Sequence, residues 1–316
     1  MLYELSQVNK ASTLAVLVKN IVAQNIMKYI PMSNIRPAYF SIYKINAKKE
    51  FNVSADAGLM VIKFNSAKQS KFDNKVNVYS LDNPDNEIKR FGWVNSKFVS
   101  NVEKYEQTEQ FDSDTEWNWR SGIKHDAGKV MELVKTGNMW TNGLNETVGL
   151  EDTYIYPLVK SSDVKKQRVH TEFRKYLLVP QKRIGEETDS IQQNAIKTWN
   201  YLNSHREFFE RRKSSIYKKA GTFAVFGIGD YSFKPYKVAI SGMYKDPIFA
   251  ILPEDEGTPI MCDDTVNFVG FDTMTEADIF CAALNSKQAK ELLHSLVFID
   301  SKRPYTINIL KRVDVI

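Results

Sequence analysis

The amino-acid sequence predicts an α/β protein, with the closing part of an α/β sheet near its N-terminus followed by a larger α+β region. Residues 14–18 are continuously apolar, which is typical of a short strand buried on both faces. Residues 19–29 then carry apolar side chains at helical intervals, and Pro31 ends that helix. Strand-like segments follow at residues 39–45 and 59–64. The order strand, helix, strand, strand is typical of the closing part of an α/β sheet, so we expect the chain to lack the earlier strands.

Residues 65–118 are polar and irregular in pattern, and Asn83, Pro84 and Asp85 predict a turn within them. We interpret this stretch as the connection between two domains. The expected boundaries are therefore residues 1–66 for the partial sheet, 67–118 for the linker, and 119–316 for a second domain that closes its own core.

The second domain is predicted to combine short strands with helices, of which one is long and amphipathic. That helix covers residues 190–211, where apolar side chains recur every three to four positions and Thr188 or Asp189 can cap the start. Strands are expected at residues 223–226 and 237–240, and helices at residues 276–284 and 287–296.

Composition argues against several classes of protein. No apolar run approaches the roughly 20 residues that cross a bilayer, so we expect no contact with a membrane. The N-terminal residues have neither the basic nor the apolar segment of a secretion signal. Cys262, Cys281 and the four histidines show no zinc-ligand spacing, so we expect no metal site and a cytoplasmic location.

The net charge of +5 is unevenly distributed along the chain. Residues 151–250 carry 18 basic and 11 acidic side chains, whereas residues 251–316 carry 6 basic and 11 acidic ones. A polyanion should therefore meet the chain mainly in its middle third. An ordinary solvated surface is the alternative explanation for these cations.

Basic residues in this region alternate with small, hydroxyl and aromatic residues, a mixture that suits nucleic acid. Arginine and lysine bind phosphates and guanine, hydroxyl groups bind phosphates, and aromatic faces stack on bases. Such clusters occur at residues 119–125, 160–163, 211–218 and 231–237. The residues expected to bind DNA are Arg120, Lys124, His125, Lys160, Lys182, Arg211, Arg212, Lys213, Tyr231, Lys234, Lys237, Lys302 and Arg303.

Two further motifs indicate different chemistry and are less specific. Residues 227–229 form a Gly-x-Gly that lacks the third glycine of a dinucleotide-binding loop, so a tight turn is the better interpretation. Residues 300–302 have the acidic-x-Lys spacing of some nucleases, and Asp263 and Asp264 are possible further ligands for a divalent cation.

The basic clusters lie in segments that resemble the C-terminal part of the adenine-N6 DNA methyltransferases of bacterial restriction–modification systems. The resemblance spans almost all of residues 119–304 and is specific to the family, though not to one DNA target. The matching segments are residues 119–126, 151–163, 179–182, 212–217, 226–233, 237–242, 263–265 and 302–304.

The N-terminal sheet resembles the same family. In the family, a Rossmann-like sheet binds S-adenosylmethionine and an Asn-Pro-Pro-aromatic motif holds the target adenine. Residues 14–64 resemble the fifth strand of that sheet, its helix, and the sixth and seventh strands. Phe51 matches the position where the family often stacks an aromatic ring on the flipped adenine. Core packing of Phe51 beside Val53 is the structural alternative.

This sequence departs from the family in two respects. It has no Asn-Pro-Pro-aromatic motif, the nearest match being residues 83–85, and no glycine-rich cofactor loop before a first strand. The exocyclic nitrogen of adenine is a poor nucleophile, so methyl transfer needs both features. The resemblance therefore implies a partial Rossmann-like methyltransferase edge followed by an α+β DNA target-recognition domain. Alone, the chain is expected to bind DNA, to hold no S-adenosylmethionine, to contain no catalytic residue and to methylate nothing.

Two partners are expected: double-stranded DNA, and a second chain that carries the cofactor-binding half of the methyltransferase. The strand next to that half would present unpaired backbone groups, so the lone chain is expected to be poorly soluble or self-associated. Three alternatives remain open: a truncated remnant of a methyltransferase, a DNA-binding specificity subunit that serves a restriction endonuclease, and a nuclease.

Overall fold

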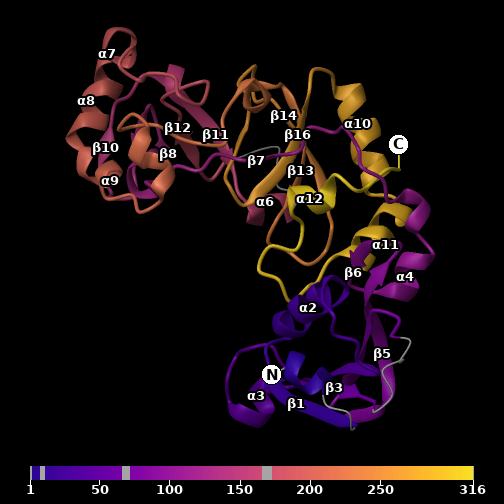
Figure 1. Ribbon diagram of the computed structural model, residues 1–316. Helices are drawn as coiled ribbons and strands as arrows, with labels where there is room; N and C mark the ends of the chain where they lie inside the picture. The colour runs from indigo at the N-terminus through magenta and orange to yellow at the C-terminus, as the bar shows by residue number, and fades with distance from the viewer. Residues whose placement is uncertain (1, 8–10, 66–71, 166–172, 316) are drawn as a thin grey trace. The chain divides into compact units, whose positions relative to one another are not determined.

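The computed structural model describes residues 2–7, 11–65, 72–165 and 173–315, and the chain divides into two compact units (Figure 1). The first unit comprises Met1–Ser113 and Lys287–Lys302, and the second comprises Asp114–Ser286 and Arg303–Ile316. These limits differ from the predicted boundaries at residues 66 and 118. The first unit continues well past residue 66 and also takes in a late helix.

The first unit is built on a six-stranded sheet with the order β1-β3-β2-β4-β5-β6. The predicted strands and helix are present as β1 (Ser12–Val18), α2 (Asn20–Tyr29), β2 (Tyr39–Ile45) and β3 (Ala57–Phe64). Strand β3 lies between β1 and β2 and is antiparallel to both. Strand β1 is therefore at the edge of the sheet. The prediction that β1 is buried on both faces is wrong, because Leu14 is buried whereas Ala15 and Leu17 are exposed, Leu17 by 52%.

The stretch predicted to be an irregular linker contains the other half of this sheet. Strand β4 (Lys75–Ser80) runs parallel to β2, and β5 (Asn83–Val94) and β6 (Lys97–Val99) follow it. Val76 and Val78 are buried while their neighbours are partly exposed, which is the alternation of a strand. The polar composition concealed this pattern because the first six residues of β5 are exposed. The predicted turn at residues 83–85 is the start of β5.

Helix α11 (Lys287–Leu296) was predicted correctly from its sequence, but it belongs to the first unit. It lies against α4 (Val102–Glu106) and β6, where the carbonyl of Ser295 accepts hydrogen bonds from the amides of Ser100 and Asn101 at 2.8 and 3.1 Å (Figure 1). Residues 119–316 therefore do not close a core of their own. A fragment cut at residue 119 would uncover the apolar face of α11, so experiments require the full chain.

The remaining helical turns of the first unit are short. They are α1 (Leu2–Gln7), α3 (Ala47–Phe51) and the 3-10 turns η1 (Ile30–Met32) and η2 (Glu109–Phe111).

The second unit contains two sheets. The six-stranded sheet has the order β10 (Thr147–Val148), β9 (Met139–Thr141), β8 (Glu132–Thr136), β12 (Tyr176–Leu178), β11 (Ile155–Val159) and β15 (Met261–Cys262). The four-stranded sheet has the order β14 (Phe249–Pro253), β13 (Tyr236–Ser241), β16 (Val266–Phe271) and β7 (Arg120–Ser121). The other helical segments are α5 (Gly128–Met131), α6 (Ser161–Lys165), η3 (Asp152–Tyr154), η4 (Ser215–Lys219), η5 (Asp230–Phe233), α10 (Met274–Leu284) and α12 (Ile307–Leu310).

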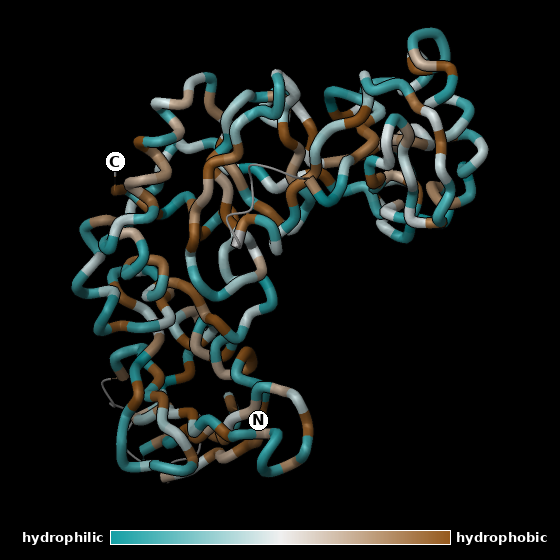
Figure 2. The backbone as a smooth tube through the Cα atoms, turned by 180° about the vertical axis from the view of Figure 1, so that it is seen from behind, coloured by the Kyte–Doolittle hydropathy of each residue, from teal (hydrophilic) through white to brown (hydrophobic). Residues whose placement is uncertain are grey.

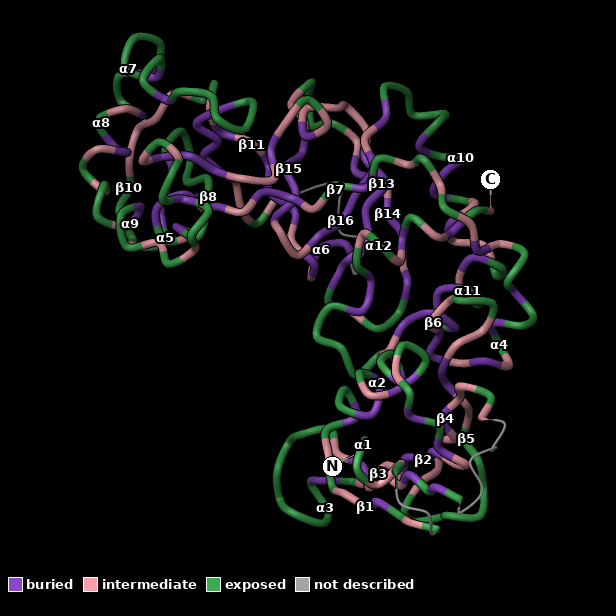
Figure 3. The backbone as a smooth tube through the Cα atoms, in the orientation of Figure 1, coloured by how far each residue is buried: buried purple, intermediate pink, exposed green. Residues whose placement is uncertain are grey.

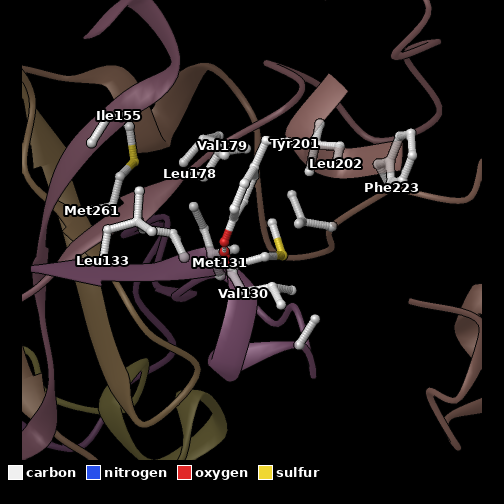
Figure 4. Packing of buried hydrophobic residues seen from close by; sticks show 14 of the residues in the cluster. Val130, Met131, Leu133, Ile155, Leu178, Val179, Tyr201, Leu202, Phe223 and Met261 are labelled. Atoms are coloured by element: carbon white, nitrogen blue, oxygen red, sulfur yellow. Dashed lines mark hydrogen bonds between the residues drawn. The ribbon is translucent and has the colours of Figure 1, made fainter. Parts of the chain in front are cut away.

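Each sheet of the second unit has its own apolar cluster. In the six-stranded part, Tyr201 enters the core and its hydroxyl donates a hydrogen bond to the carbonyl of Val130 at 2.7 Å (Figure 4). Around the four-stranded sheet, Ala239, Leu252 and Phe268 pack together, and Figure 3 shows the buried backbone following β13, β14 and β16. The predicted strand at residues 237–240 and helix at residues 276–284 are confirmed.

The predicted long helix at residues 190–211 is instead three short ones, α7 (Ile191–Asn194), α8 (Ile196–Ser204) and α9 (Arg206–Glu210). The backbone leaves the helical region at Ala195, with φ −154° and ψ 73°. Helix α8 begins there because the Glu151 carboxylate accepts hydrogen bonds from the amides of Lys197 and Thr198. Because the capping residue lies more than 40 positions earlier in the chain, the local sequence around residue 195 gives no signal for this helix start.

The aromatic segment at residues 223–226 was predicted to be a strand, but it forms only an isolated bridge from Phe226 to Lys124. Hydrophobic stretches along the chain are short and alternate with hydrophilic ones (Figure 2). Among the described residues, no helix is long and apolar enough to cross a membrane.

Candidate nucleic-acid interface

Three segments that carry the family resemblance meet in the second unit. The amides of Gly122 and Ile123 donate to the carbonyls of Val266 and Cys262 at 3.0 and 2.7 Å. Lys124 and Phe226 exchange two backbone hydrogen bonds, at 2.8 and 3.0 Å. Residues far apart in the sequence therefore form one joint at the end of the four-stranded sheet.

Two glycines allow this joint to close. Gly227 has φ +70°, and a Cβ atom there would lie 2.3 Å from the carbonyl oxygen of Gly122. A Cβ atom on Gly122 would lie 2.2 Å from the carbonyl oxygen of Asp263. The Gly-x-Gly motif thus serves close backbone packing and a tight turn, as the turn interpretation predicted, and it leaves no open loop around which a dinucleotide could bind.

Hydrogen bonds and an ion pair fix the cluster at residues 160–163 at the start of α6. One Asp163 carboxylate oxygen accepts a hydrogen bond from the amide of Lys160 at 2.9 Å, and the other pairs with Arg174. Ser161 donates its hydroxyl to the carbonyl of Thr265 at 2.7 Å. These polar residues stabilise the loop, so Lys160 is the member of the cluster that remains a candidate for DNA contact.

Two predicted DNA-binding residues are buried, which removes them from a DNA-facing surface. Lys237 is 0% exposed, its Nζ donates to the carbonyl of Lys234 at 2.8 Å, and burial lowers its pKa to about 8. His125 is 8% exposed, its Nδ1 accepts from the amide of Ala127 at 3.2 Å, and burial lowers the pKa of its imidazole. Both assignments are corrected: Lys237 lies on β13, an interior strand of the sheet whose residues 237–241 are all buried, and His125 lies buried in the loop before α5.

Arg212 also has a structural role. Its Nη1 donates to the carbonyl of Ala224 at 2.6 Å, and its Nη2 donates to the carbonyl of Thr222 at 2.7 Å. Its guanidinium lies 3.7 Å from the centroid of the Tyr217 ring. In the basic run at residues 211–213, Arg212 therefore braces the loop at residues 222–224 by binding its carbonyls, whereas the other two cations are exposed.

Replacing Arg212 with alanine should destabilise the protein by about 2 to 4 kcal/mol, because several buried carbonyls lose a charged donor. Arg211, which is exposed and pairs with Glu207 at 2.7 Å, provides the matched control. Arg211→Ala should change stability by less than about 0.5 kcal/mol. Denaturant unfolding of the two variants checks this, and equal midpoints would contradict the bracing role.

Five of the predicted cations are paired with carboxylates. The pairs are Lys124 with Asp126 at 2.8 Å, Lys160 with Glu132 at 2.6 Å, Arg211 with Glu207 at 2.7 Å, Lys234 with Asp272 at 2.5 Å, and Arg303 with Asp264 at 3.1 Å. Glu132, which sequence reasoning missed, also lies 3.6 Å from Lys175 and from His125. Its position among three basic groups comes from strand pairing, so no local pattern could have revealed it.

The remaining predicted residues differ in environment. Lys182, Lys213 and Lys302 are exposed, and Lys302 lies in the first unit. Arg120 is exposed on β7, and its guanidinium lies over the ring of Tyr231, 4.9 Å from the centroid. In the described part of the second unit, no carboxylate lies within ion-pair distance of Arg120, Lys182 or Lys213.

The proposed nuclease ligands are divided between the two units and already engaged in other contacts. Asp263 accepts hydrogen bonds from the amide and hydroxyl of Thr265, and Asp264 pairs with Arg303. Asp300 belongs to the first unit and accepts from Asn20 at 3.3 Å. Within the described ranges, no three acidic, histidine or cysteine side chains are grouped as a metal site. The nuclease hypothesis thus gains no support from this arrangement.

Phe51 ends α3, in the connection between β2 and β3, and is 50% exposed. Val53 is 48% exposed. Core packing of Phe51 beside Val53 is therefore excluded, and the aromatic ring is accessible from solvent. Stacking on adenine stays a prediction.

The fold of the chain, which is mixed α/β with several sheets, is similar to that of a restriction–modification enzyme. The Type IIL restriction–modification enzyme MmeI, solved in complex with DNA, aligns with a TM-score of 0.57 over 95% of this chain and 38% of its own. At 9% sequence identity, this likeness concerns the fold alone. The type IIG restriction endonuclease BpuSI aligns with a TM-score of 0.36, which supports no conclusion.

The sequence itself identifies a methyltransferase relative. The Type II methyltransferase M.NspV of Nostoc sp. (strain ATCC 29411 / PCC 7524) is 38% identical over 303 residues, which cover 95% of this chain and 62% of the relative. The chain is therefore a homologue of a Type II methyltransferase and spans less than two thirds of its length. No family model matches the chain. The resemblance deduced from the motifs is confirmed at this level.

Proposed function

We propose that this chain is the DNA-recognition half of a site-specific adenine-N6 DNA methyltransferase of a restriction–modification system. The observation that carries the proposal is the 38% identity to a Type II methyltransferase over nearly the whole chain. Because the chain spans 62% of that relative, the cofactor-binding half would come from residues outside this sequence. The protein would act in the cytoplasm, and a restriction endonuclease would be its functional companion.

The architecture of the first unit supports the assignment of DNA recognition to this chain and of cofactor binding to another half. The elements β1, α2, β2 and β3 occur in the chain order expected of the fifth strand, its helix, and the sixth and seventh strands. Among the described strands, β1 is paired with β3 alone, so its other edge carries backbone groups that can pair with another strand. A strand from the cofactor-binding half would complete the sheet there. Phe51 would stack on the extruded adenine from the loop between β2 and β3.

The Gly-x-Gly loop of this chain does not fit S-adenosylmethionine. A binding loop needs glycines that leave room for the ligand, and the Gly-x-Gly at residues 227–229 is filled by the backbone of Gly122. The sequence also has no Asn-Pro-Pro-aromatic motif to hold adenine. Cofactor binding and methyl transfer are therefore assigned to the other half.

Co-expression with the polypeptide that carries the Asn-Pro-Pro-aromatic motif tests the proposal. The lone chain should bind no S-adenosylmethionine in titration calorimetry and should transfer no labelled methyl group to DNA. The co-purified pair should do both, and Phe51→Ala in the pair should lower methyl transfer by tenfold or more, because the flipped base loses its stacking partner.

Two outcomes would overturn the proposal or part of it. Micromolar binding of S-adenosylmethionine by the lone chain would show that the cofactor site lies within it. A pair that binds specific DNA without methyl transfer would favour a specificity subunit that serves an endonuclease.

A further inference from the structure

Arg120 is held differently from the other arginines predicted to bind DNA. Arg211 and Arg303 are paired with carboxylates, and Arg212 is bound by backbone carbonyls. Arg120 is exposed, and in the described part of the chain its guanidinium is held by the face of Tyr231. Stacking on a ring uses the flat face of a guanidinium, so its N–H donors stay available at the edge.

The Tyr231 ring, on which Arg120 stacks, is itself held in place by its neighbours. The Tyr231 ring is partly buried and lies 6.1 Å from the Phe268 ring. Phe268 on β16 is the strand partner of Arg120 on β7, so both side chains project from one paired position of the sheet. Gly229 leaves the ring its space, since a Cβ atom at Gly229 would lie 2.7 Å from the ring. The arginine is therefore oriented before any ligand arrives.

The chemistry of a preorganised, unpaired guanidinium favours one ligand. Two parallel N–H donors of arginine match O6 and N7 of guanine in the major groove, and this is the commonest base-specific contact in protein–DNA complexes. An arginine that pairs with a carboxylate has already committed donors: Arg303 gives one N–H to the Asp264 carbonyl at 2.8 Å and one to its carboxylate at 3.1 Å. Flexible lysines such as Lys213 suit phosphates, because they present a point charge without a fork.

We propose that Arg120 reads a guanine in the recognition site and that Tyr231 positions its guanidinium for this contact. The proposal rests on the proposed function, since it requires that the chain recognise DNA. It adds which cation discriminates between bases and which side chain orients it.

Selection from a library of randomised DNA duplexes, read by sequencing, tests the assignment with the full chain. The wild-type chain should enrich a motif that contains at least one invariant guanine. Arg120→Lys keeps the charge but loses the fork, and should lower the preference at one guanine position by about 5- to 150-fold while the other positions are retained. Tyr231→Leu should weaken the same position, and Tyr231→Phe, which keeps the ring, should not.

Lys213→Ala is the matched control for a phosphate contact, and it should weaken binding to every sequence alike. The proposal is overturned if Arg120→Lys and Arg120→Ala select the unchanged motif, or if both lower affinity equally for all sequences, because Arg120 would then bind phosphate or lie outside the interface. A wild-type chain that enriches no motif would instead refute DNA recognition by this chain, and the assignment of Arg120 with it.

Discussion

Raising the salt concentration from 50 to 200 mM should weaken DNA binding by the full chain roughly a thousandfold. Each lysine or arginine that neutralises a phosphate releases condensed counterions, and about six such contacts give a drop of this size. The exposed candidates are Lys182 and Lys213, together with cations that can exchange a surface carboxylate for phosphate, such as Arg211 and Lys234. Surface ion pairs are weak enough for this exchange to cost little.

Equilibrium binding measured at several salt concentrations gives the slope of log K against the logarithm of the salt concentration, which reports the number of phosphate contacts. Lys182→Ala and Lys213→Ala should each reduce the slope by about one, because each removes one phosphate contact. Lys237→Met is the control at a buried lysine, and it should leave the slope unchanged since Lys237 is fully buried. An affinity that stays constant between 50 and 200 mM would rule out a phosphate-binding face on this chain.

Substituting alanine for Gly227 should destabilise the second unit by about 3 kcal/mol or more. The new Cβ would overlap the carbonyl oxygen of Gly122 at 2.3 Å, and the positive φ of +70° adds backbone strain. Both partners in the clash are backbone, so neither can move aside by changing a rotamer. The joint between residues 120–125 and 226–229 should open, and DNA binding should be lost with it.

Gly221 provides the matched control, because a Cβ atom there would meet no atom within 4 Å. Gly221→Ala should therefore stay within about 0.5 kcal/mol of the wild type. Urea unfolding followed by tryptophan fluorescence suits the comparison, since Trp117, Trp119, Trp140 and Trp199 lie in the second unit and only Trp93 in the first. Equal stability of the two variants would show that the close crossing of the glycines is not needed.

Helices and strands whose apolar residues recur at regular intervals within the element itself were predicted correctly from the sequence. Strand β2 and helix α11 have the predicted bounds, and α2 begins within one residue of them. Helix α8 was not resolved from its neighbours, because its first turn is capped by Glu151 from a distant segment. The sheet strands after residue 72 were missed because the exposed half of β5 diluted their alternation.

The candidate interface also depends on contacts between distant segments, which the sequence pattern did not predict. The sequence by itself determined the similarity to a Type II methyltransferase, the charge of the middle third and the types of residue that suit DNA. Only the tertiary structure decided that Lys237 is buried, that Arg212 braces carbonyls and that Arg120 stacks on Tyr231. Arg120 and Tyr231 are over a hundred positions apart in the chain; strand pairing places Arg120 beside Phe268, and the Tyr231 ring of η5 packs against Phe268. A side chain's type follows from the sequence directly, whereas its burial and its partner depend on long-range contacts that no local pattern encodes.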